Sequence, residues 1–449
     1  MAEENERRAA DEVEIIEADT EVPRASVVRR SGTFESFQHR DYSLFWSGSL
    51  VSNMGSWMQN YALAIVVYSL RQSELDSGIV QFVAGVPVLF LALPAGLLAD
   101  RMDKRQLLIW SQVVMLVQAV ALGLLFNSGR LSSSDPLRSL VWIAALGLLG
   151  GVMSALMFPA WQSLLPDLVP RDTLLNAIAL NSAQFQSARL LGPLAAAGLV
   201  LVGAGMGEIF YVNAASFVFV IAALWAIRPH PLAESQQNPH RGPTEGAWRT
   251  LTAGLRYARE HRPVGTLLIS TAIMTIFGMP YMMLLPAFAD KALGGGEVET
   301  AYLMAANGLG AVIGALAVAS LKKSTNRERL IPFALLAFSL LLAAFSQSTT
   351  LGTAMLFSAL AGAGILTVNS LANTSIQSAV PTQLRGRVMA LFVMSFMGLM
   401  PISSLIFGPI GEVIGPARAI LGGSIALATW AIVLLSNRWL LRPRQDTAA

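Results

Sequence analysis

The stretch GLLADRMDKR, residues 96–105, decides the fold, because it places a dense group of acidic and basic side chains directly after a long apolar run. The run reaches back to about Ile79 and is long enough for a buried or membrane-spanning helix. Charged side chains are costly inside hydrocarbon, so the span has to end near Ala99. The stretch is therefore predicted to be a short loop at a membrane surface.

The composition excludes a soluble fold and several kinds of chemistry. Of the 449 residues, 54% are hydrophobic and 13% are charged, about half the charged fraction of an average soluble domain. The chain has no cysteine, and its four histidines lie outside the apolar runs, so we expect no disulfide, no metal site and no cofactor. The phosphate-binding pattern Gly-x-x-x-x-Gly-Lys-Ser/Thr is absent, so the chain is not expected to hydrolyse ATP.

Apolar runs of about 17 or more residues recur along the chain, and each is a candidate membrane span. Helices are expected, because a helix pairs its backbone N–H groups within its own segment, whereas a barrel needs shorter alternating strands. We predict an all-α integral membrane protein with twelve transmembrane helices, near residues 43–69, 77–99, 106–127, 139–164, 174–202, 208–227, 264–289, 300–321, 329–346, 351–376, 387–409 and 417–436.

The basic residues predict the orientation, because lysine and arginine accumulate in cytoplasmic loops. With both termini in the cytoplasm, twenty basic residues after residue 30 lie on the cytoplasmic side and five on the opposite side. We expect a multi-pass protein of the inner (plasma) membrane. The predicted organisation is a disordered cytoplasmic tail at 1–33, a six-helix half at 34–227, a cytoplasmic linker with an amphipathic helix at 228–263, a second six-helix half at 264–440 and a tail at 441–449.

The two predicted halves share a repeated sequence pattern. The segment 162–166, Gln-Ser-Leu-Leu-Pro, closes the fourth predicted span, and the segment 377–381, Gln-Ser-Ala-Val-Pro, closes the tenth. A repeat of six helices is typical of transporters whose halves rock about a central site.

With these features the chain resembles the major facilitator superfamily from about residue 40 to residue 444. The superfamily signature Gly-x-x-x-Asp-Arg-x-Gly-Arg-Lys is matched by Gly96, Asp100, Arg101, Lys104 and Arg105. Asp103 stands where the signature has glycine, which favours an aspartate-stabilised turn over one that needs a positive φ angle.

Three further segments are similar to the enterobactin-exporter-like branch of the superfamily: Arg40-Asp41-Tyr42, the pattern Ser-x-x-Gly-Ser-Trp-Met-Gln at 52–59, and Arg-Gly-Arg-Val-Met at 385–389. The resemblance implies the major facilitator fold, export of an organic compound and coupling to protons.

The signature is expected to form a conformational latch. Asp100 can accept hydrogen bonds from the N-terminus of the eleventh helix, and Arg101 or Arg105 can pair with Asp167 or Asp172. The predicted latch consists of Gly96, Asp100, Arg101, Lys104, Arg105, Arg385 and Arg387. The alternative is that these charges only fix the orientation of the chain in the membrane.

Arg189 is the only ionisable residue placed near the middle of a predicted span. It shares one helix face with Ser182, Gln186 and Pro193. That face is expected to look into a central cavity, where Arg189 would attract an anionic group of the substrate. The alternative is a purely structural arginine.

Two polar stripes follow a single helix face, Ser49 to Asn60 on the first span and Asn369 to Gln377 on the tenth. The resemblance puts both spans around the central cavity, although hydrogen bonding between helices is an open alternative. The predicted substrate-binding residues are Asn53, Ser56, Asn60, Gln186, Arg189, Asn369, Asn373 and Gln377.

Small residues predict close helix packing. Gly192 and Pro193 resemble the start of the Gly-Pro-x-x-Gly-Gly motif of superfamily antiporters, with alanine at 196 and 197 in place of the glycines, and a packing role is expected. The pairs Gly147/Gly151 and Gly310/Gly314 are interpreted as helix crossings.

The predicted function is secondary active export of an organic amphipathic small molecule, siderophore- or drug-like, by alternating access and proton-coupled antiport. The expected partners are this substrate, the lipid bilayer and a coupling proton, for a protein that acts as a monomer and binds no nucleic acid. Proton coupling rests on the resemblance alone, because no carboxylate lies at mid-span. A lysophospholipid or metabolite transporter is the alternative within transport. A membrane sensor or enzyme is the alternative outside it, although the chain lacks the clustered His, Asp or Glu residues of an enzyme.

Overall fold

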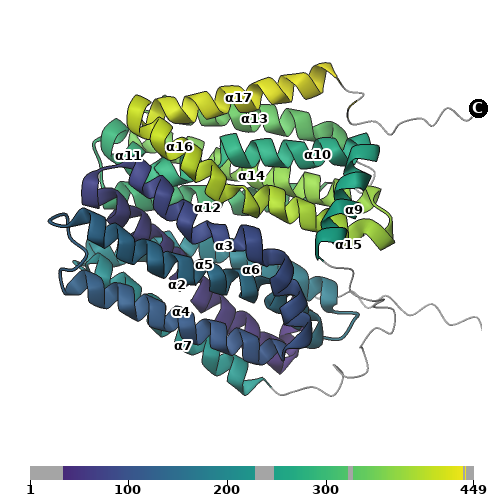
Figure 1. Ribbon diagram of the computed structural model, residues 1–449, viewed down its shortest axis with the longest axis horizontal. Helices are drawn as coiled ribbons and strands as arrows, with labels where there is room; N and C mark the ends of the chain where they lie inside the picture. Colours follow the sequence, from purple (N-terminus) through teal and green to yellow (C-terminus); the bar gives the residue numbers. More distant parts are fainter. Residues whose placement is uncertain (1–33, 228–246, 322–326, 438–439, 441–449) are drawn as a thin grey trace, which may run out of the picture.

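The computed structural model describes residues 34–227, 247–321, 327–437 and 440, with the backbone alone described at 92–101, 247–251 and 382–383. These residues form a bundle of long helices, and no strand occurs among them (Figure 1). The predicted tails and the first part of the predicted linker, 228–246, lie outside the described residues.

The first half of the chain forms six long helices after a short 3-10 turn, η1 (Glu35–Gln38). They are α2 (Arg40–Arg71), α3 (Glu74–Arg101), α4 (Lys104–Asn127), α5 (Pro136–Leu164), α6 (Leu174–Leu201) and α7 (Met206–Ala226). The turn between α3 and α4 is stabilised by Asp103, whose side chain accepts a 3.1 Å hydrogen bond from the backbone N–H of Gln106. Because Asp103 has a φ angle of −61°, the prediction of an aspartate-stabilised turn without a positive φ is confirmed.

The second half follows an amphipathic helix, α9 (Ala247–Glu260). Its elements are α10 (Arg262–Ile273), η3 (Met274–Gly278), α11 (Tyr281–Leu293), α12 (Glu297–Ala319), α13 (Arg327–Ser346), α14 (Leu351–Ala379), α15 (Thr382–Val393), η4 (Met394–Gly398), α16 (Met400–Ile414) and α17 (Pro416–Ser436).

The seventh and eleventh predicted spans are not the continuous α-helices that the sequence pattern suggested. Each is interrupted by a π-helical segment, η3 or η4, and each segment is followed by a proline. Because Pro280 has no N–H group, the carbonyl of Ile276 four residues earlier loses its helical partner. The hydroxyl of Ser403 donates a 2.8 Å hydrogen bond to that carbonyl. In η4 the carbonyl oxygen of Phe396 accepts a 3.4 Å hydrogen bond from the hydroxyl of Thr275. Each π-segment therefore receives a hydroxyl donor from the neighbouring helix, as a backbone break inside a membrane requires.

Ten helices of the described part, counting each interrupted span once, are long and apolar enough to cross a membrane. The expected count of twelve is therefore not confirmed by length and hydropathy. Among the long helices, α2 and α6 fall outside the ten. They are the helices that carry Asn53, Ser56, Asn60, Gln186 and Arg189, so the polar faces that predict a substrate site also lower the mean hydropathy of their helices.

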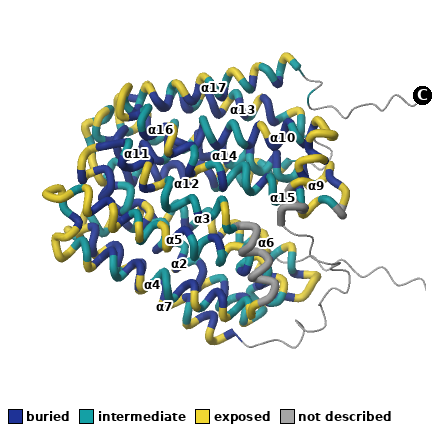
Figure 2. The backbone as a smooth tube through the Cα atoms, in the orientation of Figure 1, coloured by how far each residue is buried: buried dark blue, intermediate teal, exposed yellow. Residues whose placement is uncertain are grey.

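The outer surface of the bundle is apolar. Large apolar side chains such as Trp110, Phe219 and Val413 are exposed. Buried residues gather where helices face each other (Figure 2). Such an apolar perimeter matches lipid rather than water. The chain is thus a multi-pass membrane protein.

Helices α2 to α7 pack mainly on one another, as do α10 to α17, and the two halves meet where α3 contacts α16 and where α6 contacts α12. We call the end of the bundle that carries α9 the proximal end and the opposite end, with the connections at 72–73, 294–296 and 415, the distal end (Figure 1). The predicted helix crossings at Gly151 and Gly310 are confirmed, because a Cβ atom there would overlap the backbone of α3 and α14, respectively.

Candidate functional site

Arg189 lies on α6, which packs between α2 of its own half and α12 of the other half. On one side, a Cβ atom at Gly192 would lie 2.9 Å from the carbonyl oxygen of Met54 on α2. On the other side, a Cβ atom at Gly308 would lie 2.7 Å from the Cα atom of Leu190, so α12 approaches α6 just as closely. The small residues allow these approaches, which fix the depth and direction of the Arg189 side chain.

The guanidinium group of Arg189 joins the two halves. It donates a hydrogen bond to the amide oxygen of Asn307 on α12, and its Cζ atom lies 5.6 Å from the ring centroid of Trp57 on α2. The Nε atom of Arg189 is buried and has no hydrogen-bond partner. No carboxylate forms an ion pair with Arg189 among the described residues. A half-buried arginine with an unused donor and no counter-ion can bind an anionic or electron-rich group.

Asn307 connects Arg189 to the second half. Its amide nitrogen donates to the hydroxyl of Tyr281 on α11 and, over 3.3 Å, to the carbonyl oxygen of Ser358 on α14. The sequence analysis missed both Asn307 and Tyr281, because it searched the spans for charged residues and for stripes of several polar residues on one helix face, and Asn307 is a single amide in its span. An amide within an apolar span was the available signal, since such groups need a partner in the bundle.

The residues of the predicted polar stripe on α2 differ in burial. Ser49 is buried and bonds back to the carbonyl oxygen of Phe45, so it does not belong to an open polar face, which corrects the expected stripe. Ser56 donates to the carbonyl oxygen of Ser52 over 2.9 Å. Asn53 and Ser56 are half-buried and Asn60 is exposed.

The predicted residues on α6 and α14 differ in burial: Asn369 and Asn373 are half-buried and Gln377 is exposed. Gln186 is half-buried, one helical turn before Arg189. Gln377 donates to the amide oxygen of Asn373 over 2.9 Å, and the buried amide nitrogen of Asn369 has no partner. A buried amide group without a hydrogen-bond partner costs free energy, so the amide nitrogen of Asn369 requires a water molecule or a ligand group as its partner.

A second polar network, which the sequence analysis missed, lies inside the first half. Asn213 on α7 donates to Gln59 on α2 over 2.8 Å, Gln59 donates to Gln118 on α4 over 3.4 Å, and Gln118 donates to the carbonyl oxygen of Leu146 on α5 over 2.9 Å. The three side chains are buried. They satisfy one another and join four helices, so this network is structural.

The basic residues at the start of α4, at the proximal end, join helices of the first half. Lys104 pairs with Asp167 over 2.9 Å and donates to the carbonyl oxygen of Ser163. Arg105 instead donates to the last carbonyl oxygens of α7, those of Leu224 and Trp225, over 2.6 and 2.7 Å. The expectation that Arg101 or Arg105 would pair with Asp167 is thus corrected for Arg105, since Lys104 takes that acid and the arginine satisfies a helix C-terminus.

The remaining members of the predicted latch stay a prediction. The side chains of Gly96, Asp100 and Arg101 lie outside the described residues. Arg385 is exposed, and Arg387 is half-buried at the start of α15.

The amphipathic helix α9 is docked on the second half and does not only lie on the membrane surface. A Cβ atom at Gly254 would lie 3.0 Å from the carbonyl oxygen of Arg387 on α15, and the hydroxyl of Tyr257 donates to the carbonyl oxygen of Ala379 over 3.4 Å. Burial raises the pKa of Tyr257, which keeps the hydroxyl protonated as a donor. The linker helix therefore caps the proximal ends of α14 and α15.

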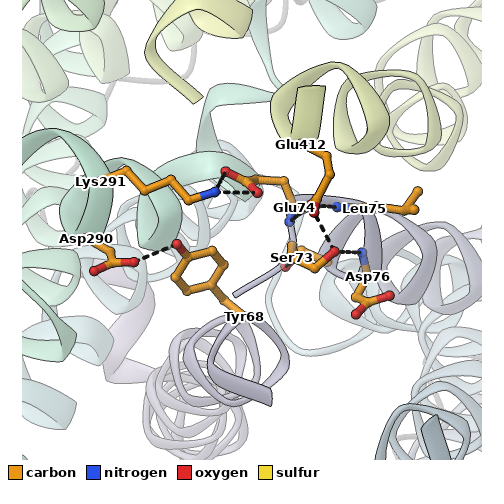
Figure 3. Close-up of polar contacts among 9 residues, drawn as sticks. Tyr68, Ser73, Glu74, Leu75, Asp76, Asp290, Lys291 and Glu412 are labelled. Carbon is orange, nitrogen blue, oxygen red and sulfur yellow. Dashed lines mark hydrogen bonds and ion pairs between the residues drawn. The ribbon is translucent and has the colours of Figure 1, made fainter. Parts of the chain in front are cut away.

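The distal end holds a dense set of contacts between the halves (Figure 3). Lys291 on α11 donates to both carboxylate oxygens of Glu74 on α3, over 2.8 and 3.0 Å. The hydroxyl of Tyr68 on α2 donates to Asp290 on α11 over 2.7 Å. Glu412 on α16 accepts hydrogen bonds from the start of α3. The distal end is therefore closed by polar contacts that no motif of the sequence predicted.

The fold and these sites define a multi-pass membrane transporter with a polar centre. The family model described as transmembrane secretion effector matches residues 31–448, and the chain belongs to this family of the major facilitator superfamily. Members of this superfamily are transporters and not enzymes, so the chain takes a small molecule as its substrate.

Several curated proteins are similar over nearly their whole length. The staphyloferrin A transporter of Staphylococcus aureus is 25% identical over 89% of this chain and 97% of its own length. The enterobactin exporter EntS of Escherichia coli O1:K1 is 23% identical over 92% and 96%, and the multidrug efflux pump Tap of Mycolicibacterium fortuitum is 23% identical over 86% and 92%. The resemblance to the enterobactin-exporter-like branch is thereby confirmed.

Solved structures share the fold. The nucleoside transporter NupG superposes with a TM-score of 0.67 at 13% identity, over 88% of this chain and 98% of its own. A bacterial homologue of the human lysosomal transporter Spinster, in an inward-facing and unoccupied conformation, gives a TM-score of 0.63 at 15% identity, over 89% and 96%.

Proposed function

We propose that the chain is a secondary active exporter that moves an amphipathic organic compound, siderophore- or drug-like and carrying anionic or electron-rich groups, out of the cytoplasm by alternating access. The observation that carries the proposal is the Arg189 guanidinium, which is held between the halves by Asn307, faces Trp57 and keeps an unused donor. An anion beside a half-buried cation is attracted more strongly than in water, because less water screens the pair.

The relatives support the class of substrate. Two of them are named for siderophores and one for multiple drugs, and each covers most of this chain. Siderophores are rich in carboxylate, catecholate or hydroxamate oxygens, which are the partners a guanidinium binds well. Trp57 beside Arg189, with Met54 one turn earlier on α2, offers an adaptable apolar wall for the rest of an amphipathic molecule.

Direction and coupling belong to the same proposal. The distribution of basic residues predicts that both termini lie in the cytoplasm, at the inner membrane, so in this proposal the closed distal end faces outward. Proton antiport as a monomer is the proposed mode of transport. Lysophospholipid or metabolite transport is the competing substrate class.

The test measures uptake of a substrate panel into inverted vesicles with an acidic lumen. The panel contains a catecholate siderophore, a carboxylate siderophore, a cationic drug, a lysophospholipid and a nucleoside. The wild type is expected to accumulate the siderophores, and Arg189→Gln is expected to raise their KM about tenfold or more, as loss of a charge-assisted hydrogen bond does. Arg138→Gln, which changes an exposed arginine on α5, is the matched control and keeps wild-type kinetics.

Each part of the proposal can fail separately. Equal handling of the anionic substrates by Arg189→Gln and wild type would assign Arg189 a structural role. Uptake that ignores the pH gradient would remove proton coupling, and accumulation of the lysophospholipid or the nucleoside alone would replace the substrate class.

A further inference from the structure

The start of α3 carries backbone donors that its own helix cannot satisfy. The first N–H groups of any α-helix lack an intrahelical acceptor. Ser73 satisfies one of them, because its hydroxyl oxygen accepts a 3.1 Å hydrogen bond from the N–H of Asp76. The N–H groups of Glu74 and Leu75 remain for a partner from outside the helix.

That partner comes from the other half of the protein. One carboxylate oxygen of Glu412, near the end of α16, accepts from the N–H of Glu74 over 2.8 Å, from the N–H of Leu75 over 3.3 Å and from the hydroxyl of Ser73 over 2.9 Å (Figure 3). A carboxylate at a helix N-terminus is stabilised both by these donors and by the helix dipole. Glu412 thus caps a helix to which it does not belong.

The two helices are in backbone contact beside this cap. A Cβ atom at Gly408 on α16 would lie 2.9 Å from the carbonyl oxygen of Glu74 and 3.1 Å from the Cα atom of Gly78 on α3. Helices that touch so closely cannot separate at their distal ends while Glu412 keeps its bonds, because those bonds span no more than about 3.3 Å. Opening the distal end therefore has to remove the cap from α3.

We propose that Glu412 is a positioning residue of the transport cycle, which latches the distal end closed by capping α3 and releases it when that end opens. The proposal rests on the alternating access of the proposed function. It also gives the distal end a counterpart of the latch predicted at Asp100. Because α3 and α15–α16 run antiparallel, each helix can offer a carboxylate near its C-terminus to the N-terminus of the other.

The absence of cysteine allows a direct test that needs no substrate. Ser77 on α3 is 9% exposed, and among the described residues its hydroxyl bonds only to the carbonyl oxygen of Ser73 in its own helix, so Ser77→Cys is a mild reporter. The full-length protein carrying it is treated in right-side-out and inverted vesicles with a membrane-impermeant maleimide. We expect Glu412→Ala to raise the labelling rate about fivefold, the equilibrium change that loss of a helix cap produces. Glu412→Gln keeps an acceptor oxygen and is expected to fall between Ala and wild type.

The matched control is Glu299→Gln. The Glu299 carboxylate also caps a helix at the distal end, since it accepts from the N–H of Gly296 over 2.7 Å, but it caps its own helix, α12. Its loss is expected to leave the labelling rate unchanged. Ser134→Cys in the exposed α4–α5 connection reports folding, because its labelling and the elution profile stay the same in every properly folded variant.

The outcomes separate the latch from the proposed function. Labelling at the wild-type rate in both Glu412 variants, or an equal rise in Glu299→Gln, would overturn the latch. Faster labelling in right-side-out vesicles supports it. Faster labelling confined to inverted vesicles supports the latch as well, but overturns the proposed orientation of the exporter.

Discussion

The ion pair between Glu74 and Lys291 provides the sharpest quantitative prediction. The two residues belong to different halves and meet over 2.8 and 3.0 Å. The side chain of Glu74 is fully buried (0% exposed), whereas that of Lys291 is 40% exposed. A single substitution therefore has different consequences on the two sides of the pair.

The asymmetry fixes the order of the effects. In Lys291→Gln the buried Glu74 carboxylate loses its cation, and an uncompensated buried charge is strongly destabilising. In Glu74→Gln the remaining Lys291 can turn to water at lower cost. A charge-assisted hydrogen bond contributes about 1.5 to 3 kcal/mol, and the exposure of Lys291 puts this pair near the lower limit. A coupling of about 1.5 kcal/mol corresponds to about a tenfold change in the ratio of closed to open distal ends.

The assay is a double-mutant cycle with Ser404→Cys as the reporter. Ser404 lies on α16 and is 8% exposed, and within the described part of the chain its hydroxyl bonds to the carbonyl oxygen of Met400 in its own helix. The labelling rate is expected to rise more in Lys291→Gln than in Glu74→Gln. In the double variant the rise is expected to be smaller than the product of the two single rises. The exchange of the two residues, Glu74→Lys with Lys291→Glu, is expected to bring the labelling rate part of the way back to that of the wild type. Additive single effects, or a larger rise in Glu74→Gln, would refute the reasoning.

Three further predictions address other parts of the bundle. Asn307→Ala removes the hydrogen-bond acceptor of Arg189 and frees its guanidinium group, so the KM for an anionic substrate is expected to fall or stay unchanged, whereas Arg189→Gln raises it. A parallel rise of the KM in both variants would mean that Asn307 only holds the fold. Gln59→Leu leaves Asn213 and Gln118 without their hydrogen-bond partner. The free energy of unfolding is expected to fall by about 1 to 2 kcal/mol, since polar contacts between membrane helices contribute up to about 1.7 kcal/mol. An unchanged melting temperature in detergent would contradict this. Gly408→Ala places a methyl group against backbone atoms that cannot move aside, so faster labelling of the distal reporter is expected, and wild-type labelling would show that α3 and α16 are not held in contact there.

The sequence was sufficient for the membrane class and most span positions. Bilayer thickness sets the length of an apolar run, so predicted runs such as 106–127 and 417–436 correspond to α4 and α17. It also gave the turn at Asp103, because a helix cap depends on residues three positions apart. The superfamily and the branch could be identified because their motifs are short, continuous segments of sequence.

The sequence did not predict the π-segments η3 and η4. Each segment needs a proline that leaves a carbonyl group without its helical donor, and a hydroxyl group from another helix that donates to the segment. Only the proline can be read from the sequence of the segment itself. The assignment of Lys104, and not Arg105, to Asp167 likewise depends on where the end of α7 lies.

The sequence by itself determined a chain of apolar helices, the loop at residues 96–105 and a lone arginine at mid-span, because each follows from the cost of placing polar groups in lipid. Only the tertiary structure decided which partners these groups have. Arg189 meets Asn307 across 118 residues, and Glu412 meets the start of α3 across more than 330. Such contacts arise when two halves of a bundle pack together, and no periodicity or motif within one helix encodes them.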